Sequence, residues 1–204
     1  MPAKRAIKAI EANSSNMALI FLELIKMAVA IKQLSNSLNS EFKKKCISIF
    51  NKRWAQFDID IYLVAYFLHP NYRGNFNYFY FLLCILYLFY SNLLDKGFQD
   101  KTFRQVALTA MQIWSRFGGN ESSCKILLNQ LRLYYNHKPP YDMEYINNYD
   151  TPELWWSTCR QPKNYIQELA LKLFAITPHQ ASCERVFSIL NWMIGKRRTR
   201  YLYL

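Results

Sequence analysis

Apolar side chains recur at steps of three and four residues along much of the chain, the spacing that places them on one face of an α-helix. The pattern runs through residues 16–38, 41–57, 100–117 and 120–131, and short polar or glycine-containing breaks separate these segments. Glycine and proline number only five and seven, too few for the many turns of an all-β protein. The sequence therefore predicts a mainly α-helical protein, arranged as a helical bundle or array.

Several residues carry signals for the start or the end of a helix. Asp58 is suited to cap a short apolar helix that stops where Pro70 prevents continuation. Gly118 and Gly119 are expected to end the helix before them, and Asn120 to cap the next one. These signals are local, so they predict helix boundaries without reference to tertiary structure.

A composition change near residue 140 suggests two regions. Residues 136–150 contain paired prolines, asparagines and acids, which favours a linker. Directly after it, Thr151-Pro152-Glu153 supplies a capping hydroxyl, a proline for the first turn and a carboxylate for the positive end of a helix. We therefore divide the chain into a helical region, 1–140, and a C-terminal region, 141–204.

Residues 75–94 form an apolar stretch of 20 residues without a charge. Its length and hydropathy meet the requirement for a membrane-spanning helix. Tyrosines are spread through its centre, however, whereas spanning helices concentrate them at the two membrane interfaces. Three interpretations stay open: a buried helix, translated noncoding sequence rich in Phe, Tyr, Leu, Ile and Asn codons, and a transmembrane span.

The charge balance favours a polyanionic partner. Lysine and arginine number 26 against 14 acidic residues, which gives a net charge of +12. The five cysteines are widely spaced, odd in number and without a CxxC pair, which argues against zinc knuckles and a disulfide framework and favours a reducing, intracellular compartment. Near the N-terminus, Glu23 and Lys26 interrupt the apolar run, so an amphipathic helix is expected there and not a cleaved leader.

Residues 164–195 have the pattern of a helical hairpin. An apolar face leads to Ile176, and Thr177 with Gln180 then forms a capping box that starts a second helix. Glu184 lies at the edge of the apolar stripe of this second helix, next to Arg185.

The residues of this hairpin resemble a known family. LALKLFAI (169–176), PHQASCERVFSIL (178–190) and KRRTR (196–200) are similar to the C-terminal region of hAT-family transposases, called the hAT dimerisation domain. The stretch DIYLVAYFLHPNYRG (60–74) and the paired tryptophans at 155–156 also resemble that family. The resemblance implies a ribonuclease-H-like catalytic core interrupted by an all-helical insertion. Residues 1–140 would be part of this insertion, and residues 141–204 would be the C-terminal helical segment of the core.

The resemblance also implies a chemistry. In that family, two Asp and one Glu hold two divalent metals for DNA cleavage and joining, and Glu184 matches the third acid. No strand bearing an Asp precedes residue 58, and Asp58 and Asp60 are better explained as acids at a helix start. Because one carboxylate cannot hold two metal ions, we expect no enzymatic activity, and no cofactor unless another chain supplied the missing acids for a divalent metal.

The activity left to such a fragment is protein dimerisation, with itself or with a longer hAT-type protein, in the nucleus. Candidate interface residues are the large apolar side chains of the C-terminal region: Trp155, Trp156, Leu169, Leu173, Phe174, Val186, Phe187 and Leu190. For the adjacent tryptophans, we expect one in the core and the other against a neighbouring element or subunit, since successive helical residues point about 100° apart.

The C-terminal basic run could contact DNA phosphates, act as a nuclear import signal, or form a solvated helix end: Lys196, Arg197, Arg198 and Arg200. Two alternatives to dimerisation are a DNA-binding transposase subunit that needs acids from another chain, and a membrane-anchored protein that uses residues 75–94. We expect neither a small-molecule substrate nor membrane attachment, and the histidines His69, His137 and His179 are interpreted as structural.

Overall fold

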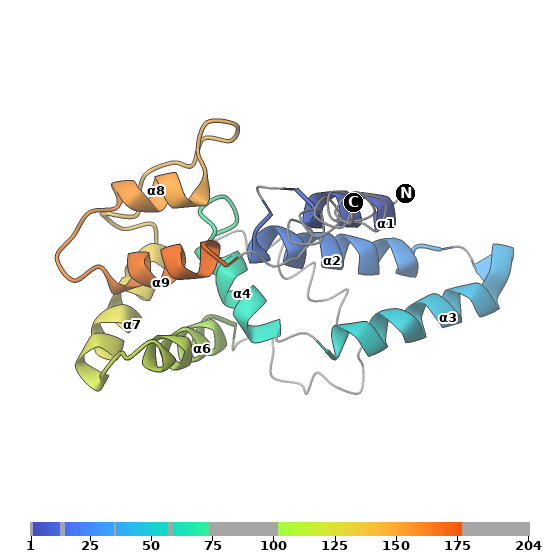
Figure 1. The fold of residues 1–204 in the computed structure, drawn as a ribbon, viewed down its shortest axis with the longest axis horizontal. Helices are drawn as coiled ribbons and strands as arrows, with labels where there is room; N and C mark the ends of the chain where they lie inside the picture. The colour runs from blue at the N-terminus through green and yellow to red at the C-terminus, as the bar shows by residue number, and fades with distance from the viewer. Residues whose placement is uncertain (1, 13–14, 35, 57–58, 74–101, 177–204) are drawn as a thin grey trace, which may run out of the picture.

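The computed structural model describes the whole chain except residues 1, 13–14, 35, 57–58, 74–101 and 177–204 (Figure 1). Its described part consists of helices and loops, without a β-strand. The helices are α1 (Pro2–Ile10), α2 (Met17–Lys32), α3 (Asn36–Trp54), α4 (Ile59–Leu68), α6 (Thr102–Arg116), α7 (Glu121–Tyr135), α8 (Pro152–Thr158) and α9 (Tyr165–Phe174). The prediction of a mainly α-helical protein is therefore confirmed for these residues.

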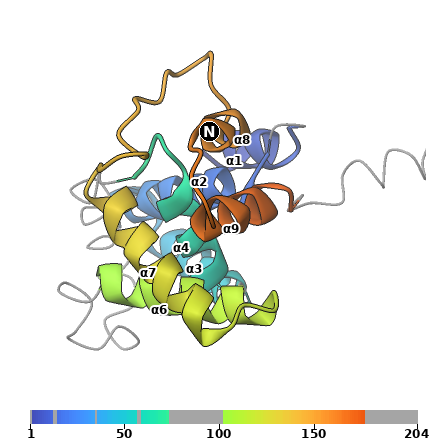
Figure 2. The ribbon, with the colours of Figure 1, turned by 90° about the vertical axis from the view of Figure 1, so that its left-hand side faces the viewer.

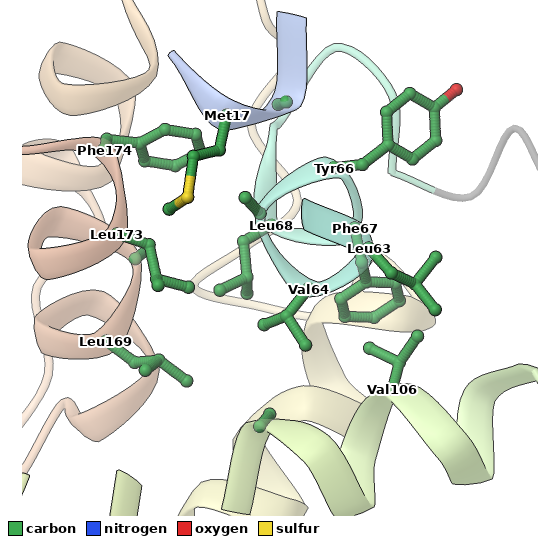
Figure 3. Packing of buried hydrophobic residues seen from close by; sticks show 14 of the residues in the cluster. Met17, Leu63, Val64, Tyr66, Phe67, Leu68, Val106, Leu169, Leu173 and Phe174 are labelled. Atoms are coloured by element: carbon green, nitrogen blue, oxygen red, sulfur yellow. The ribbon is translucent and has the colours of Figure 1, made fainter. Parts of the chain in front are cut away.

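Helix α4 occupies the centre of the molecule. Its sequence is apolar around the whole circumference, a pattern typical of a helix buried on all sides. Residues 63–68 are all buried, and α4 packs against α2, α6 and α9. In Figure 3, Leu68 lies opposite Leu173 of α9, and Phe67 lies toward Val106 of α6. The short helix predicted to end at Pro70 is thus the element around which the others are assembled.

The N-terminal helices form one side of the molecule. Helix α2 packs against α1, α3 and α4. Its Phe21 contacts Trp54 of α3 and Tyr66 of α4, with ring centroids 6.3 and 5.5 Å apart. Helix α3 runs beside α2 and extends beyond it to the edge of the molecule (Figure 1).

Helices α6, α7 and α9 form the opposite side, where they surround the end of α4 (Figure 2). The turn between α6 and α7 uses both predicted glycines. Gly118 has a φ of +91°, a left-handed conformation that glycine adopts without strain. Gly119 lies so close to Trp114 that an added Cβ would be 2.2 Å from the indole Cδ1. Asn120 then caps α7 through its side-chain oxygen, as predicted.

The predicted start of α8 is also confirmed. The Thr151 hydroxyl accepts a hydrogen bond from the backbone N–H of Leu154 at 3.2 Å, and Pro152 occupies the first turn. The prediction was less accurate for residues 16–38, where the helical pattern continues but α2 ends at Lys32 and α3 begins at Asn36. The chain between them contains neither glycine nor proline, so it carries no local stop signal.

One hydrophobic core joins the described parts of the two regions that we divided at residue 140. It includes Leu63 and Leu131 from the first region and Trp156 and Leu169 from the second. The expected linker takes part in it, because Tyr141 is fully buried. The apolar stretch 75–94 and the second helix of the expected hairpin lie outside the described residues. Within the described helices, no stretch is both long enough and apolar enough to cross a membrane.

Candidate functional site

The five described residues of the expected dimer interface all lie in the core of the single chain. Trp155, Trp156, Leu169, Leu173 and Phe174 are at most 5% exposed. Leu173 lies opposite Leu68 of α4, and Phe174 lies beside Met17 of α2 (Figure 3). A partner could contact these five residues only if α8 and α9 moved away from the rest of the molecule.

The two tryptophans differ in what holds them. The Trp156 indole N–H donates a hydrogen bond to the backbone carbonyl of Leu68 at 2.9 Å, which ties α8 to the end of α4 across 88 positions of sequence. Trp155 packs edge-on against Trp156, with centroids 5.1 Å apart, and against Tyr134 of α7. Both side chains therefore bind α8 to the body of the molecule, and neither faces outward.

Arg73 is the central polar residue of this junction. Only 8% of its surface is exposed. Its guanidinium carbon lies 4.7 Å from the ring centre of Trp155 and 5.1 Å from that of Tyr134, which is cation–π geometry. Its N–H groups donate to the backbone carbonyls of Tyr141 and Met143. A single side chain thus connects the segment after α4 with α7, α8 and the loop that precedes α8.

Burial shifts the pKa values of the ionisable groups at this junction. Desolvation lowers the pKa of Arg73, yet a guanidinium stays charged at neutral pH. Desolvation raises the pKa of Tyr134 and Tyr141, so both phenols stay neutral. It also raises the pKa of the Cys159 thiol to about 11, which keeps this cysteine in the unreactive protonated form.

A small hydrogen-bond network closes the junction on the α9 side. The Asn164 side-chain oxygen accepts from the Tyr141 hydroxyl at 3.2 Å and from the Gln161 amide at 3.1 Å. The Asn164 amide donates to the carbonyl of Cys159. Among the described residues, the Tyr134 hydroxyl and the Trp155 indole N–H are buried without a hydrogen-bond partner. The junction is rich in donors and aromatic faces, an arrangement suited to fixing helices relative to one another.

His69 lies beside this junction, at the end of α4. Its ring stacks on Tyr72, with centroids 4.3 Å apart, and meets Phe174 edge-on at 5.9 Å. Desolvation lowers the pKa of His69 to about 4, so the imidazole is neutral at physiological pH. Its Nδ1 accepts a hydrogen bond from the backbone N–H of Asn71 at 3.3 Å. These contacts are those of a packing residue, as interpreted from the sequence.

The other residues predicted for catalysis, dimerisation or nucleic-acid contact are not described by the structure. Outside the described residues are Glu184, Val186, Phe187, Leu190, Lys196, Arg197, Arg198 and Arg200. Asp60 is exposed in the first turn of α4, where the positive end of the helix dipole stabilises a carboxylate. Within the described ranges, no group of three or more His, Cys, Asp or Glu side chains is placed to hold a metal ion.

The sequence pattern did not predict Arg73, Tyr141 and Asn164, which organise the buried junction. All three lie in loops, where no periodicity distinguishes a buried side chain from an exposed one. The sequence offered a signal for Arg73. This residue follows an apolar helix and a His-Pro turn, in the stretch 60–74 that resembles the hAT family.

A set of large apolar side chains is exposed next to the junction. Met143, Ile146 and Tyr149 lie in the loop before α8, and Leu154 lies on α8 itself; Tyr149 is 83% exposed. A turn holds the loop in place, because the Asp150 carboxylate accepts from the backbone N–H of Ile146 at 2.8 Å. We call these four residues the 143–154 apolar set.

Comparisons with family models, with characterised proteins and with solved structures gave no match to this chain. The hAT resemblance therefore depends on the residues quoted above, and the function that it implies is a proposal.

Proposed function

We propose that this chain is a protein dimerisation module derived from a hAT transposase and catalytically incomplete. Its partner is a second copy or a longer hAT-type protein, and its place of action is the nucleus. The ribonuclease-H-like origin of the C-terminal segment belongs to the same proposal. The sequence of residues 164–200 supports it, as does the mainly helical fold of the described part.

The observation that carries the proposal is the 143–154 apolar set. These four large apolar side chains lie within twelve positions of sequence. The inward residues of the neighbouring helices α8 and α9 are already buried in the chain's own core. A contiguous exposed apolar patch is typical of a surface that a partner covers, and the proposal is that these four side chains form one. Val186, Phe187 and Leu190, which lie outside the described residues, stay further candidate interface residues in this proposal.

The five buried residues predicted for the interface have a structural role in this proposal instead of contacting the partner: Trp155, Trp156, Leu169, Leu173 and Phe174. They hold α8 and α9 against α4 and α7, and so fix the surface that the partner meets. Their replacement would unfold the module before it weakened an interface. A test of dimerisation must therefore change exposed residues.

Glu184 has no catalytic part in this proposal. Two-metal phosphoryl transfer needs several converging carboxylates, and the residues described before α4 form helices and loops, without a strand that would carry the other two. The C-terminal basic run would assist nuclear import or contact phosphate.

Sedimentation velocity of the full chain over a micromolar concentration series tests the proposal. We expect a concentration-dependent dimer, and we expect the double substitution Tyr149→Ser/Leu154→Ser to weaken it by about tenfold to a hundredfold, because each side chain loses its burial at the interface. The matched control is Ile7→Ser/Leu108→Ser, which changes two exposed apolar residues on α1 and α6. A wild-type chain that stays monomeric throughout the series would refute the dimerisation proposal.

A further inference from the structure

The ammonium of Lys172, on α9, lies against two aromatic rings at the end of α6. Its Nζ is 4.8 Å from the ring centre of Phe117 and 5.3 Å from that of Trp114. Both distances allow cation–π attraction, which extends to about 6 Å. Glu168 lies one turn earlier on α9, at the spacing that favours a Glu–Lys pair, yet these two described residues form no ion pair. The rings therefore hold this ammonium in preference to a neighbouring carboxylate.

Trp114 is held in place from several sides. Its indole N–H donates a hydrogen bond to the Ser123 hydroxyl at 2.9 Å, and its ring centre is 5.2 Å from that of Tyr165. The backbone of Gly119 passes close to its Cδ1. The side chain is 5% exposed. A ring that is fixed in advance binds a cation without losing rotational freedom of its own.

Phe117 and Lys172 form the outer part of this arrangement. Phe117 directly follows the last residue of α6 and is 46% exposed, and Lys172 is exposed as well. The lysine side chain is flexible, and water hydrates its ammonium strongly. The ammonium can therefore return to solvent at small cost, which leaves the faces of the two rings to another cation.

We propose that Trp114 and Phe117 form a binding site for a methylated ammonium group, and that Lys172 occupies this site in the free protein. Aromatic faces are the surfaces by which proteins recognise quaternary ammonium groups, because the ring quadrupole attracts the charge while the methyl groups contact the ring. This inference is independent of the dimerisation proposed above, because the 143–154 apolar set lies on other elements.

The chain's own lysine determines which cation can bind. An unmethylated lysine of a partner would have to displace an identical ammonium that is tethered beside the rings, and a tethered group has a high effective concentration. A trimethylated ammonium keeps the charge and adds methyl groups that bury apolar surface against the rings. The occupied site therefore selects methylated ligands over lysine, and the Glu168 carboxylate nearby adds electrostatic attraction for either cation.

NMR titration of the full chain, observed at the indole N–H of Trp114, tests the site. The probes are choline, a peptide with one trimethyllysine, the same peptide with unmodified lysine, and 3,3-dimethylbutanol, which has the shape of choline without its charge. We expect the two methylated cations to shift the signal with Kd values on the order of millimolar, and the other two probes to leave it in place. The tighter of the two methylated probes identifies the source of the ligand, a modified protein or a free quaternary ammonium.

Substitutions test the internal occupant and the rings separately. Lys172→Gln removes the competing ammonium, so we expect it to tighten choline binding by at least about threefold. Its matched control is Lys138→Gln, which removes the same charge at an exposed position in the loop after α7 and should leave the affinity unchanged. Phe117→Leu keeps an apolar side chain without the ring and should weaken binding by about fivefold to thirtyfold, whereas Phe117→Tyr should retain it. Circular dichroism of each variant verifies that the helices are intact.

Three results would overturn the proposal. The first is that neither methylated cation shifts the Trp114 signal, in the unaltered chain or in Lys172→Gln. The second is equal binding of choline and 3,3-dimethylbutanol, which would mean apolar contact without recognition of the charge. The third is that Lys172→Gln binds choline no more tightly than Lys138→Gln, which would reduce the Lys172 contact to a fastening between α9 and the end of α6.

Discussion

At the scale of single residues, the most informative side chain is Arg73. A guanidinium needs several hydrogen bonds when it leaves water, since an unsatisfied buried charge is strongly destabilising. Here two backbone carbonyls accept from it and two aromatic rings cover its faces. A lysine could not reproduce this arrangement, because it lacks both the planar face and the fork of donors. Arg73 therefore fixes the geometry of the junction through its shape as well as its charge.

His69 gives the molecule a predictable response to acid. Its pKa is about 4 in the folded chain and 6.5 when it is exposed. The unfolded state thus binds the proton first, and folding stability is fully present above pH 6.5 and falls as the pH drops toward 4, by roughly 3 kcal/mol in all.

Urea unfolding at pH 7 and pH 4.5 measures this effect. We expect His69→Gln to remove most of the loss of stability between the two pH values, while His137→Gln, at an exposed position, should keep most of it. An unchanged pH dependence in His69→Gln would show that other groups are responsible.

At the scale of helices, local signals and tertiary contacts determine different boundaries. The caps at Asn120 and Thr151 were predictable because a side chain and a backbone N–H three residues away decide them. The end of α2 was not predictable, because the sequence there continues in helical periodicity and the break follows from the packing of α3 back onto α2. The inward burial of both tryptophans was likewise missed: Trp156 meets the end of α4 and Trp155 meets Tyr134 of α7, so two adjacent residues of α8 face the core.

The turn between α6 and α7 allows a matched pair of substitutions. Gly119→Ala would force the Trp114 indole to move and break its hydrogen bond to the Ser123 hydroxyl, now 2.9 Å long. We expect a loss of about 2–4 kcal/mol in the free energy of unfolding. Gly118→Ala meets open space and only strains a left-handed φ, at a cost of about 1 kcal/mol. Thermal and urea unfolding of both variants compares them, and an equal loss would contradict the close approach of Gly119 to Trp114.

At the scale of the whole molecule, the described helices share one core even though the composition suggested two regions. The composition of the chain predicts a boundary at the proline-rich segment, because prolines and asparagines usually indicate a linker. It could not reveal that Tyr141 turns inward from this segment, or that Arg73 binds its backbone. The candidate site was less predictable than the fold for the same reason, since it is built from loops that come together only in three dimensions.

A shared core predicts cooperative unfolding. Trp156→Phe keeps most of the ring packing and removes the hydrogen bond to the Leu68 carbonyl, so we expect a loss of about 1–2 kcal/mol in the stability of the entire molecule. Circular dichroism reports all helices, and tryptophan fluorescence reports the surroundings of the indoles. The two signals should give one coincident unfolding transition in the unaltered chain and in Trp156→Phe. Separate transitions for the two probes would mean that the regions on either side of residue 140 unfold independently.

The burial of α4 has a consequence for how this sequence can change. An amphipathic helix accepts polar replacements along the side that meets water, and random drift accumulates there. Residues 63–68 have no such side, since every one of them touches the interior. Substitution in this block can only exchange one apolar shape for another, so the oldest traces of the ancestral sequence should persist in the middle of the molecule.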